Sequence, residues 1–195
     1  MENERSVHLT PLQWSSFKPL FARQKYMPKS KLLKTLGTSS LAVYSELGGQ
    51  NFTEKEFQIA LGYELNQQGI EYLRETHIEL FYKNIPIKLG APDFFLNKEK
   101  SPAIIEIKLG ASLNNSNRQQ LKMYLLSIKK NPRSVLKKVK RGILINFLKD
   151  NPLTFEKEEL NKDKEAYLIE IEIFTLDKNN ELKLLESDCL GQLSK

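Results

Sequence analysis

The amino-acid sequence predicts an α/β fold in which helices pack on a mixed β-sheet. Apolar residues recur at helical spacing over about 53–68 and again over about 117–130. Between and after these segments, apolar residues alternate or run together over lengths typical of strands. The resulting order of helix, three strands, helix and strand is typical of helices layered on one sheet.

Residues 1–48 are expected to form a helical extension in front of the main domain. Short helices are predicted over Ser30–Leu36, ended by Gly37, and over Ser40–Leu47, ended by Gly48. Nothing in this segment has the spacing of a catalytic motif. If the protein is a scaffold subunit, this segment is the part that would dock a protein partner.

The first long helix begins with a capping box, in which Thr53 is the N-cap and Glu56 is its partner. Glu54 lies at the N-terminal end of the apolar stripe of this helix, where a charged residue is unusual. Glu54 is therefore a candidate functional residue. The alternative is that its charge stabilises the helix N-terminus through the macrodipole. The stripe consists of Phe57, Leu61 and Leu65.

The strands are expected after this helix, with a tight turn at Lys83-Asn84 between the first two. Residues 49–178 then form the predicted main domain, and 179–195 form a C-terminal tail. The predicted strands are Tyr72–Tyr82, Ile85–Leu96, Ala103–Leu109, Gly142–Phe147 and Glu165–Leu176, with a helix over Asn117–Lys130.

Asp93, Glu106 and Lys108 form the candidate active site. Strand alternation places Glu106 and Lys108 on one face, ~7 Å apart. Two carboxylates on neighbouring strands can share Mg²⁺ or Mn²⁺, and the carbonyl of Ile107 can add an oxygen ligand. The cation would polarise a phosphate and activate water, while Lys108 would act on that water and offset developing charge. An edge strand with a solvated charged face is the structural alternative.

These residues resemble a known family. Pro92-Asp93 followed by Glu106-Ile-Lys108 resembles the signature of the PD-(D/E)XK nuclease superfamily. Gln120 and Tyr124 are similar to the Gln-x-x-x-Tyr motif of its RecB-like branch. The resemblance implies a restriction-endonuclease-like core and a metal-dependent nuclease in which Gln120 and Tyr124 support the site or contact nucleic acid.

The nearest resemblance is to the group called GxxExxY proteins, over about Asn51 to Phe147. It implies that Glu54 is the helix carboxylate of the site. Asn51 and Phe57 stand where that group has the Gly and Tyr of its name, and Asn117 stands where His is common. The metal-binding positions are retained.

The formal net charge is +6, and one short segment is strongly basic. Such asymmetry indicates a polyanionic partner, with DNA favoured, although a solvated basic face is the alternative. Two rival functions remain open: a nucleic-acid-binding module without turnover, and a scaffold subunit of a repair or nuclease assembly. The basic segment comprises Lys129, Lys130, Arg133, Lys137, Lys138, Lys140 and Arg141.

No apolar run reaches the ~20 residues of a membrane helix, and the N-terminal sequence has no apolar segment of a secretory signal. Cys189 is the only cysteine, which excludes an internal disulfide and a cysteine-based zinc cluster. These features predict an intracellular protein, cytoplasmic or nuclear, with no membrane partner.

Overall fold

The computed structural model describes residues 29–49, 51–97, 102–131, 136, 138–149 and 167–192. Two of the predicted nucleic-acid-binding residues, Arg133 and Lys137, lie outside the described residues, as do residues 1–28 of the predicted extension.

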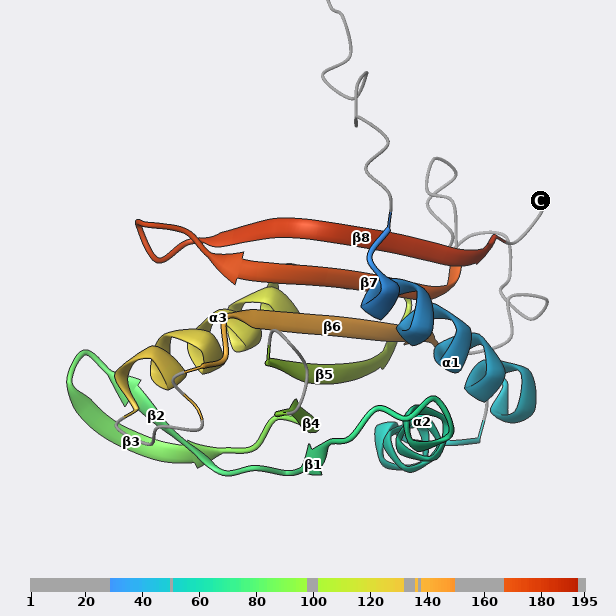
Figure 1. Cartoon of the computed structure of the whole chain (residues 1–195), viewed down its shortest axis with the longest axis horizontal. Helices are drawn as coiled ribbons and strands as arrows, with labels where there is room; N and C mark the ends of the chain where they lie inside the picture. The colour runs from blue at the N-terminus through green and yellow to red at the C-terminus, as the bar shows by residue number, and fades with distance from the viewer. Residues whose placement is uncertain are drawn as a thin grey trace, which may run out of the picture.

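The described chain contains a six-stranded mixed sheet in the order β1-β4-β5-β6-β7-β8 (Figure 1). The central β5 and β6 are parallel, and the other neighbouring pairs are antiparallel. This architecture confirms the predicted restriction-endonuclease-like α/β class. The strands of this sheet are β1 (Leu73–Arg74), β4 (Phe94–Leu96), β5 (Ala103–Gly110), β6 (Arg141–Leu148), β7 (Tyr167–Leu176) and β8 (Leu182–Gln192).

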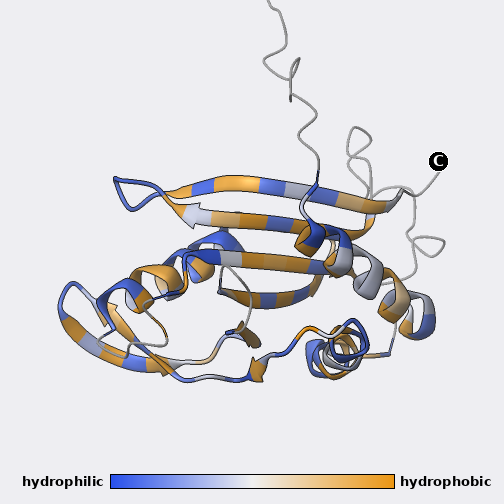
Figure 2. Ribbon diagram, viewed as in Figure 1, coloured by the Kyte–Doolittle hydropathy of each residue, from blue (hydrophilic) through white to orange (hydrophobic). Residues whose placement is uncertain are grey.

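Helices cover both faces of the sheet. On one face lie α1 (Lys31–Leu47) and α2 (Glu54–Gln67), and on the other lies α3 (Asn115–Lys130). Alternation along β5 serves both cores, because Ile105 packs with α1 and α2 while Ile104 packs with α3. Figure 2 shows the long central strands as largely hydrophobic ribbons between these helices. None of the described helices is long and apolar enough to cross a membrane.

The first two predicted strands are each divided. Tyr72–Tyr82 contains β1 and β2 (Ile78–Tyr82), and Ile85–Leu96 contains β3 (Ile85–Gly90) and β4. β2 and β3 form a separate two-stranded sheet around the predicted turn, where Lys83 has a φ of 53°. Glu75 ends the extended run after β1. Its φ of 50° lies in the left-handed region, which a strand does not allow.

The segment predicted as two short helices is a single helix, α1. Gly37 does not end the helix but lies inside it, facing β8. A Cβ at this position would lie 2.8 Å from the Cδ1 of Leu190 in β8. Gly37 therefore permits close packing on the sheet. Gly48, with a φ of 64°, ends the helix as predicted.

α1 is part of the core rather than an appendage. Leu33, Leu36, Val43 and Tyr44 are buried in the same cluster as the apolar stripe of α2. The Tyr44 hydroxyl donates a hydrogen bond to the carbonyl of Leu148 at the end of β6, at 3.1 Å.

The predicted C-terminal tail also contains regular structure. β8 pairs along nearly the whole length of β7, with Leu176 opposite Leu182 and Tyr167 opposite Gln192. α1 and β8 therefore extend the folded core on both sides of the predicted 49–178 domain.

Candidate active site

The site lies where β5 continues beyond its neighbour β4. β4 pairs with β5 only from Ala103 to Ile105, whereas β6 accompanies β5 as far as Gly110. The N–H and C=O of alternate residues, Ile107 and Leu109, point toward the side that β4 has left. Main-chain groups on this edge therefore need other partners.

Two carboxylates provide them. Asp93, directly before β4, accepts a hydrogen bond from the N–H of Ile107 at 2.6 Å. Glu54, the first residue of α2, accepts one from the N–H of Leu109 at 3.2 Å. Because N–H and C=O of one strand residue share an edge, the carbonyl of Ile107 points to the same side as Asp93.

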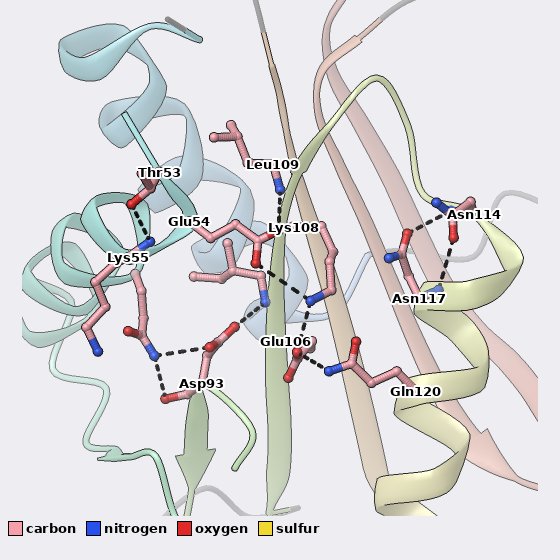
Figure 3. A network of polar contacts seen from close by, with 12 residues as sticks. Thr53, Glu54, Lys55, Asp93, Glu106, Lys108, Leu109, Asn114, Asn117 and Gln120 are labelled. Atoms are coloured by element: carbon pink, nitrogen blue, oxygen red, sulfur yellow. Dashed lines mark hydrogen bonds and ion pairs between the residues drawn. The ribbon is translucent and has the colours of Figure 1, made fainter. Parts of the chain in front are cut away.

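Glu106 and Lys108 meet Glu54 and Gln120 at this end of the strand (Figure 3). The Oε1 atom of Glu106 accepts from Lys108 Nζ at 3.0 Å and from Gln120 Nε2 at 2.6 Å. Lys108 Nζ also lies 3.8 Å from Oε2 of Glu54. The sequence prediction that these side chains share one site therefore agrees with their contacts.

The second oxygen of Glu106, Oε2, is buried and has no hydrogen-bond partner within the described structure. A buried carboxylate oxygen without a donor is costly, since it has lost water and gained no substitute. Such an atom indicates a ligand that is not a protein group, such as a cation or an ordered water.

Two carboxyl groups, those of the half-buried Asp93 and the buried Glu106, lie close together and dominate the electrostatics of the site. Burial, with a contribution from Asp93, raises the pKa of Glu106 to about 7. Burial also raises the pKa of Asp93, although the hydrogen bond from Ile107 acts in the opposite direction. A positive charge placed between these carboxylates would therefore lower the free energy of both ionised forms.

Lys108 remains a cation in this setting. Burial works against its charge, but the carboxylates around it, led by Glu106, outweigh burial and raise the pKa of the ammonium group. The group is thus a hydrogen-bond donor and a positive charge at neutral pH.

Gln120 and Tyr124 lie one helical turn apart on α3, as predicted. Gln120 Nε2 is 3.4 Å from the Tyr124 hydroxyl, so Gln120 links the tyrosine to Glu106. The Tyr124 ring is buried against Gly90, where an added Cβ would lie 2.6 Å from the ring. Burial raises the pKa of the tyrosine, which keeps the phenol neutral.

A model of the PD-(D/E)XK nuclease superfamily matches residues 30–158, about two thirds of the chain. The chain belongs to this superfamily. Its members hydrolyse phosphodiester bonds and typically use divalent metals, so a nucleic-acid substrate is implied. The match begins at residue 30 and so includes α1. No curated protein and no solved structure matches the chain.

The residues at the end of β5 fit the divalent metal of the superfamily. Asp93 and Glu106 offer carboxylate oxygens, one of them unpartnered, and Ile107 offers its carbonyl at the same edge. In the described part of the chain, no three His, Cys, Asp or Glu residues gather as a metal cluster. The donor set therefore suits Mg²⁺ or Mn²⁺, hard cations that are held by few carboxylates and keep several waters.

Two departures from the GxxExxY pattern have structural explanations. Phe57 is fully buried, with its ring centroid 4.6 Å from that of Phe147, so this position faces the core. Asn117 forms a reciprocal capping box with Asn114, each N–H donating to the other side chain at 3.0 Å. The helix consequently begins at Asn115, two residues earlier than predicted.

The described residues of the basic segment lie at the opposite end of the sheet from Asp93 and Glu106. Arg141 opens β6 opposite Ala103, and Lys108 lies five residues further along β5, or ~17 Å. Lys129 and Lys130 end α3, and Lys129 donates to Asn180 in the turn between β7 and β8, at the same end of the sheet. Sequence reasoning missed Lys83, whose carbonyl accepts a hydrogen bond from Lys130, so the β2–β3 turn joins this basic surface.

Sequence reasoning also missed Gln58. This side chain is only 3% exposed, and its Nε2 donates to Oδ1 of Asp93 at 3.1 Å. It lies one helical turn after Glu54, on the same face of α2, and that spacing is the signal that could have identified it.

Proposed function

We propose that this protein is a divalent-metal-dependent nuclease that cleaves DNA, with Asp93 and Glu106 as the metal ligands. The observation that carries the proposal is the buried, unpartnered Oε2 of Glu106 beside Asp93 at the open end of β5. A purely structural carboxylate pair would be expected to have all its buried oxygens hydrogen-bonded.

In this proposal Asp93, Glu106 and the carbonyl of Ile107 hold Mg²⁺ or Mn²⁺. When bound, such a cation polarises a phosphate and makes hydroxide accessible near neutral pH. Lys108 is the catalytic cation of the chain. Because its pKa is raised, it acts through charge and hydrogen bonding on the attacked phosphate.

Three further residues complete the proposed site. Glu54 keeps Lys108 near the end of β5 and caps the N–H of Leu109. Gln120 holds one oxygen of Glu106, which leaves Oε2 for the cation. Tyr124 supports Gln120 from the buried side of α3.

The proposed binding surface for the DNA backbone is the basic end of the sheet. Duplex DNA rises by ~3.4 Å per base pair along its axis, so the ~17 Å to Lys108, taken parallel to that axis, corresponds to about five base pairs. A substrate would therefore contact the basic surface and the carboxylates at once. The proposed contacts on this surface are Lys83, Lys129, Lys130, Lys138, Lys140 and Arg141, and Arg133 and Lys137, which lie outside the described residues, are proposed from the sequence alone.

Within the superfamily, we propose the RecB-like GxxExxY group as the nearest branch. The Glu54, Gln120 and Tyr124 positions support that placement, since their side chains converge on Glu106 and Lys108. The apolar face of α1 is used inside the core. A protein-docking role for the predicted extension would accordingly be assigned to residues 1–28.

Cleavage of labelled single- and double-stranded DNA and RNA, each with Mg²⁺, Mn²⁺ or EDTA, tests the proposed function. We expect DNA cleavage with metal and none with EDTA, and we expect Glu106→Gln protein to lose it. Salt-sensitive DNA binding without cleavage under any condition would favour the rival reading, a binding module without turnover. Equal cleavage by wild type and Glu106→Gln would reject the assigned site.

A further inference from the structure

Gln58 connects the metal-ligand candidate Asp93 to an arginine outside the site. Its Nε2 donates to the Oδ1 of Asp93 at 3.1 Å and lies 3.4 Å from the main-chain carbonyl of the same residue. Its Oε1 accepts a hydrogen bond from Arg74 Nη2 at 2.7 Å. A buried amide on α2 is thus held between an exposed guanidinium on β1 and a carboxylate of the site.

The orientation of the Gln58 amide is set by both neighbours. If the amide were rotated by 180°, its oxygen would face the Asp93 carboxylate and its NH₂ group would face the Arg74 guanidinium. Both contacts would be repulsive, since an acceptor would meet an acceptor and a donor would meet a donor. Arg74 therefore reinforces the orientation in which Gln58 presents its donor to Asp93.

The Asp93 carboxylate is consequently fixed at both oxygens. Ile107 N–H holds Oδ2 at 2.6 Å and Gln58 holds Oδ1, so the plane of the carboxylate cannot rotate without breaking a hydrogen bond. Hydrogen-bonding partners of this kind orient metal ligands, and their loss typically weakens metal affinity.

We propose that Gln58 is a positioning residue for the metal site and that Arg74 acts through it. This inference rests on the proposed function, because it needs Asp93 to be a metal ligand. The cleft beside Asp93 is lined by Gln58 together with Glu54, Lys55, Glu75 and Ala91, so the buried amide lies directly behind the open side of the proposed metal site.

Mn²⁺ binding to the full-length protein, measured by electron paramagnetic resonance or calorimetry, tests this role. Gln58→Met keeps the length of the side chain but removes the donor, and we expect the Kd for Mn²⁺ to rise ~10–100-fold. Arg74→Met should raise the Kd in the same direction, and Arg74→Lys should retain most of the affinity. Adding Arg74→Met to Gln58→Met should cause no further loss. Gln67→Met, at an exposed glutamine of the same helix, is the matched control and should bind as wild type.

A merely structural role is separated by two further readouts. The melting temperature in EDTA reports folding without metal, and a structural role would lower it while leaving the Kd for Mn²⁺ unchanged. Cleavage by Gln58→Met should recover at high Mn²⁺ concentration, because Asp93 and Glu106 remain. If Gln58→Met does not fold, Arg74→Met carries the test, since the arginine is exposed.

Unchanged Mn²⁺ affinity in Gln58→Met, or in Arg74→Met where that variant carries the test, overturns this inference and leaves the proposed function intact. A wild-type protein that binds no Mn²⁺ overturns both.

Discussion

The carboxylate of Asp93 accepts the main-chain N–H of Ile107 two residues past the last pairing between β4 and β5. Asp93 thus takes the place of a strand neighbour on the open edge of β5. The same contact brings the carboxylate beside the carbonyl of Ile107 and next to Glu106. One side chain therefore both ends the strand pairing and forms part of the proposed metal site.

Asp93→Asn should fold but should lose metal binding. The amide oxygen of asparagine can still accept from Ile107, while its NH₂ group would face the NH₂ of Gln58. For wild type, Mg²⁺ or Mn²⁺ at ~100 times Kd should raise stability by about 2.7 kcal/mol, or roughly 5–10 °C in melting temperature. We expect most of this rise to be absent in Asp93→Asn by thermal melting. Glu75→Gln, an exposed carboxylate of the same cleft, is the control. Equal rises in wild type and Asp93→Asn would contradict the ligand assignment.

Glu54→Gln should reduce cleavage sharply with little change in stability. Glutamine retains an acceptor for the N–H of Leu109 but removes the charge near Lys108. Glu56→Gln is the matched control, because it removes the same charge from the same first turn of α2. Cleavage kinetics and melting temperatures of both variants separate a role of Glu54 in the active site from a role in stabilising the helix N-terminus. If both variants cleave normally and lose similar stability, Glu54 acts only on the helix dipole.

The protein without metal should become less stable as pH rises from about 5 to 8. The folded-state pKa of Glu106, about 7, is above its ordinary value of 4.5, so the folded protein binds more protons in this window. The stabilisation is present below the unfolded pKa and is lost as pH rises through 7. Full ionisation of Glu106 lowers the free energy of unfolding by on the order of 3 kcal/mol.

Melting curves in EDTA at several pH values measure this effect. Glu106→Gln should flatten the profile, although Asp93, whose pKa is also raised, should leave a residual slope of the same sign. A wild-type melting temperature that stays constant or rises between pH 5 and 8 would show that Glu106 ionises normally.

The core of the site could be predicted from the sequence because its spacing is local. Glu106 and Lys108 lie two residues apart on one strand, and strand alternation alone places them on one face. Asp93 was identified through its Pro92 neighbour and the Glu-x-Lys motif. The capping box of α2 followed from Thr53 and Glu56, which are three residues apart, and the structure confirms it.

The missed features depend on contacts between distant segments. Gln58 donates to Asp93, 35 residues away; its spacing from Glu54 places it on the same face of α2 but does not show which residue it contacts. Gly37 has the signature of a helix end, yet it is retained inside α1 because Leu190 packs against it. The separate β2–β3 hairpin arises from packing of β2 on α3, which the alternation of apolar residues does not encode.

A chain beginning at Gly49 should lose cooperative folding. It lacks α1, whose four buried hydrophobic side chains each contribute ~1.5–3 kcal/mol, a sum comparable with the 5–15 kcal/mol stability of a typical domain. A chain beginning at Lys29 retains α1 and the ion pair of Lys29 with Asp188, and it should melt cooperatively. Circular dichroism melting compares the two. Cooperative melting of the shorter chain, with an intact rise on adding metal, would restore the boundary at residue 48. The four side chains are those of Leu33, Leu36, Val43 and Tyr44.

Cleavage and DNA binding should be separable, because Lys108 and the basic surface lie at opposite ends of β5. Replacing Lys137, Lys138, Lys140 and Arg141 should weaken duplex binding and flatten the slope of log K against log salt by ~0.9 per lost phosphate contact. Cleavage at saturating DNA should survive in that variant, provided that it melts as wild type does.

The most direct test of the account is single-turnover cleavage of one labelled DNA duplex by Lys108→Ala protein at saturating concentration in Mg²⁺ or Mn²⁺, with affinity measured on the same duplex. We expect affinity within a few-fold of wild type and no detectable hydrolysis, since Lys108 is the cation placed beside the proposed metal ligands. Hydrolysis at the wild-type rate would show that the end of β5 is not the catalytic site.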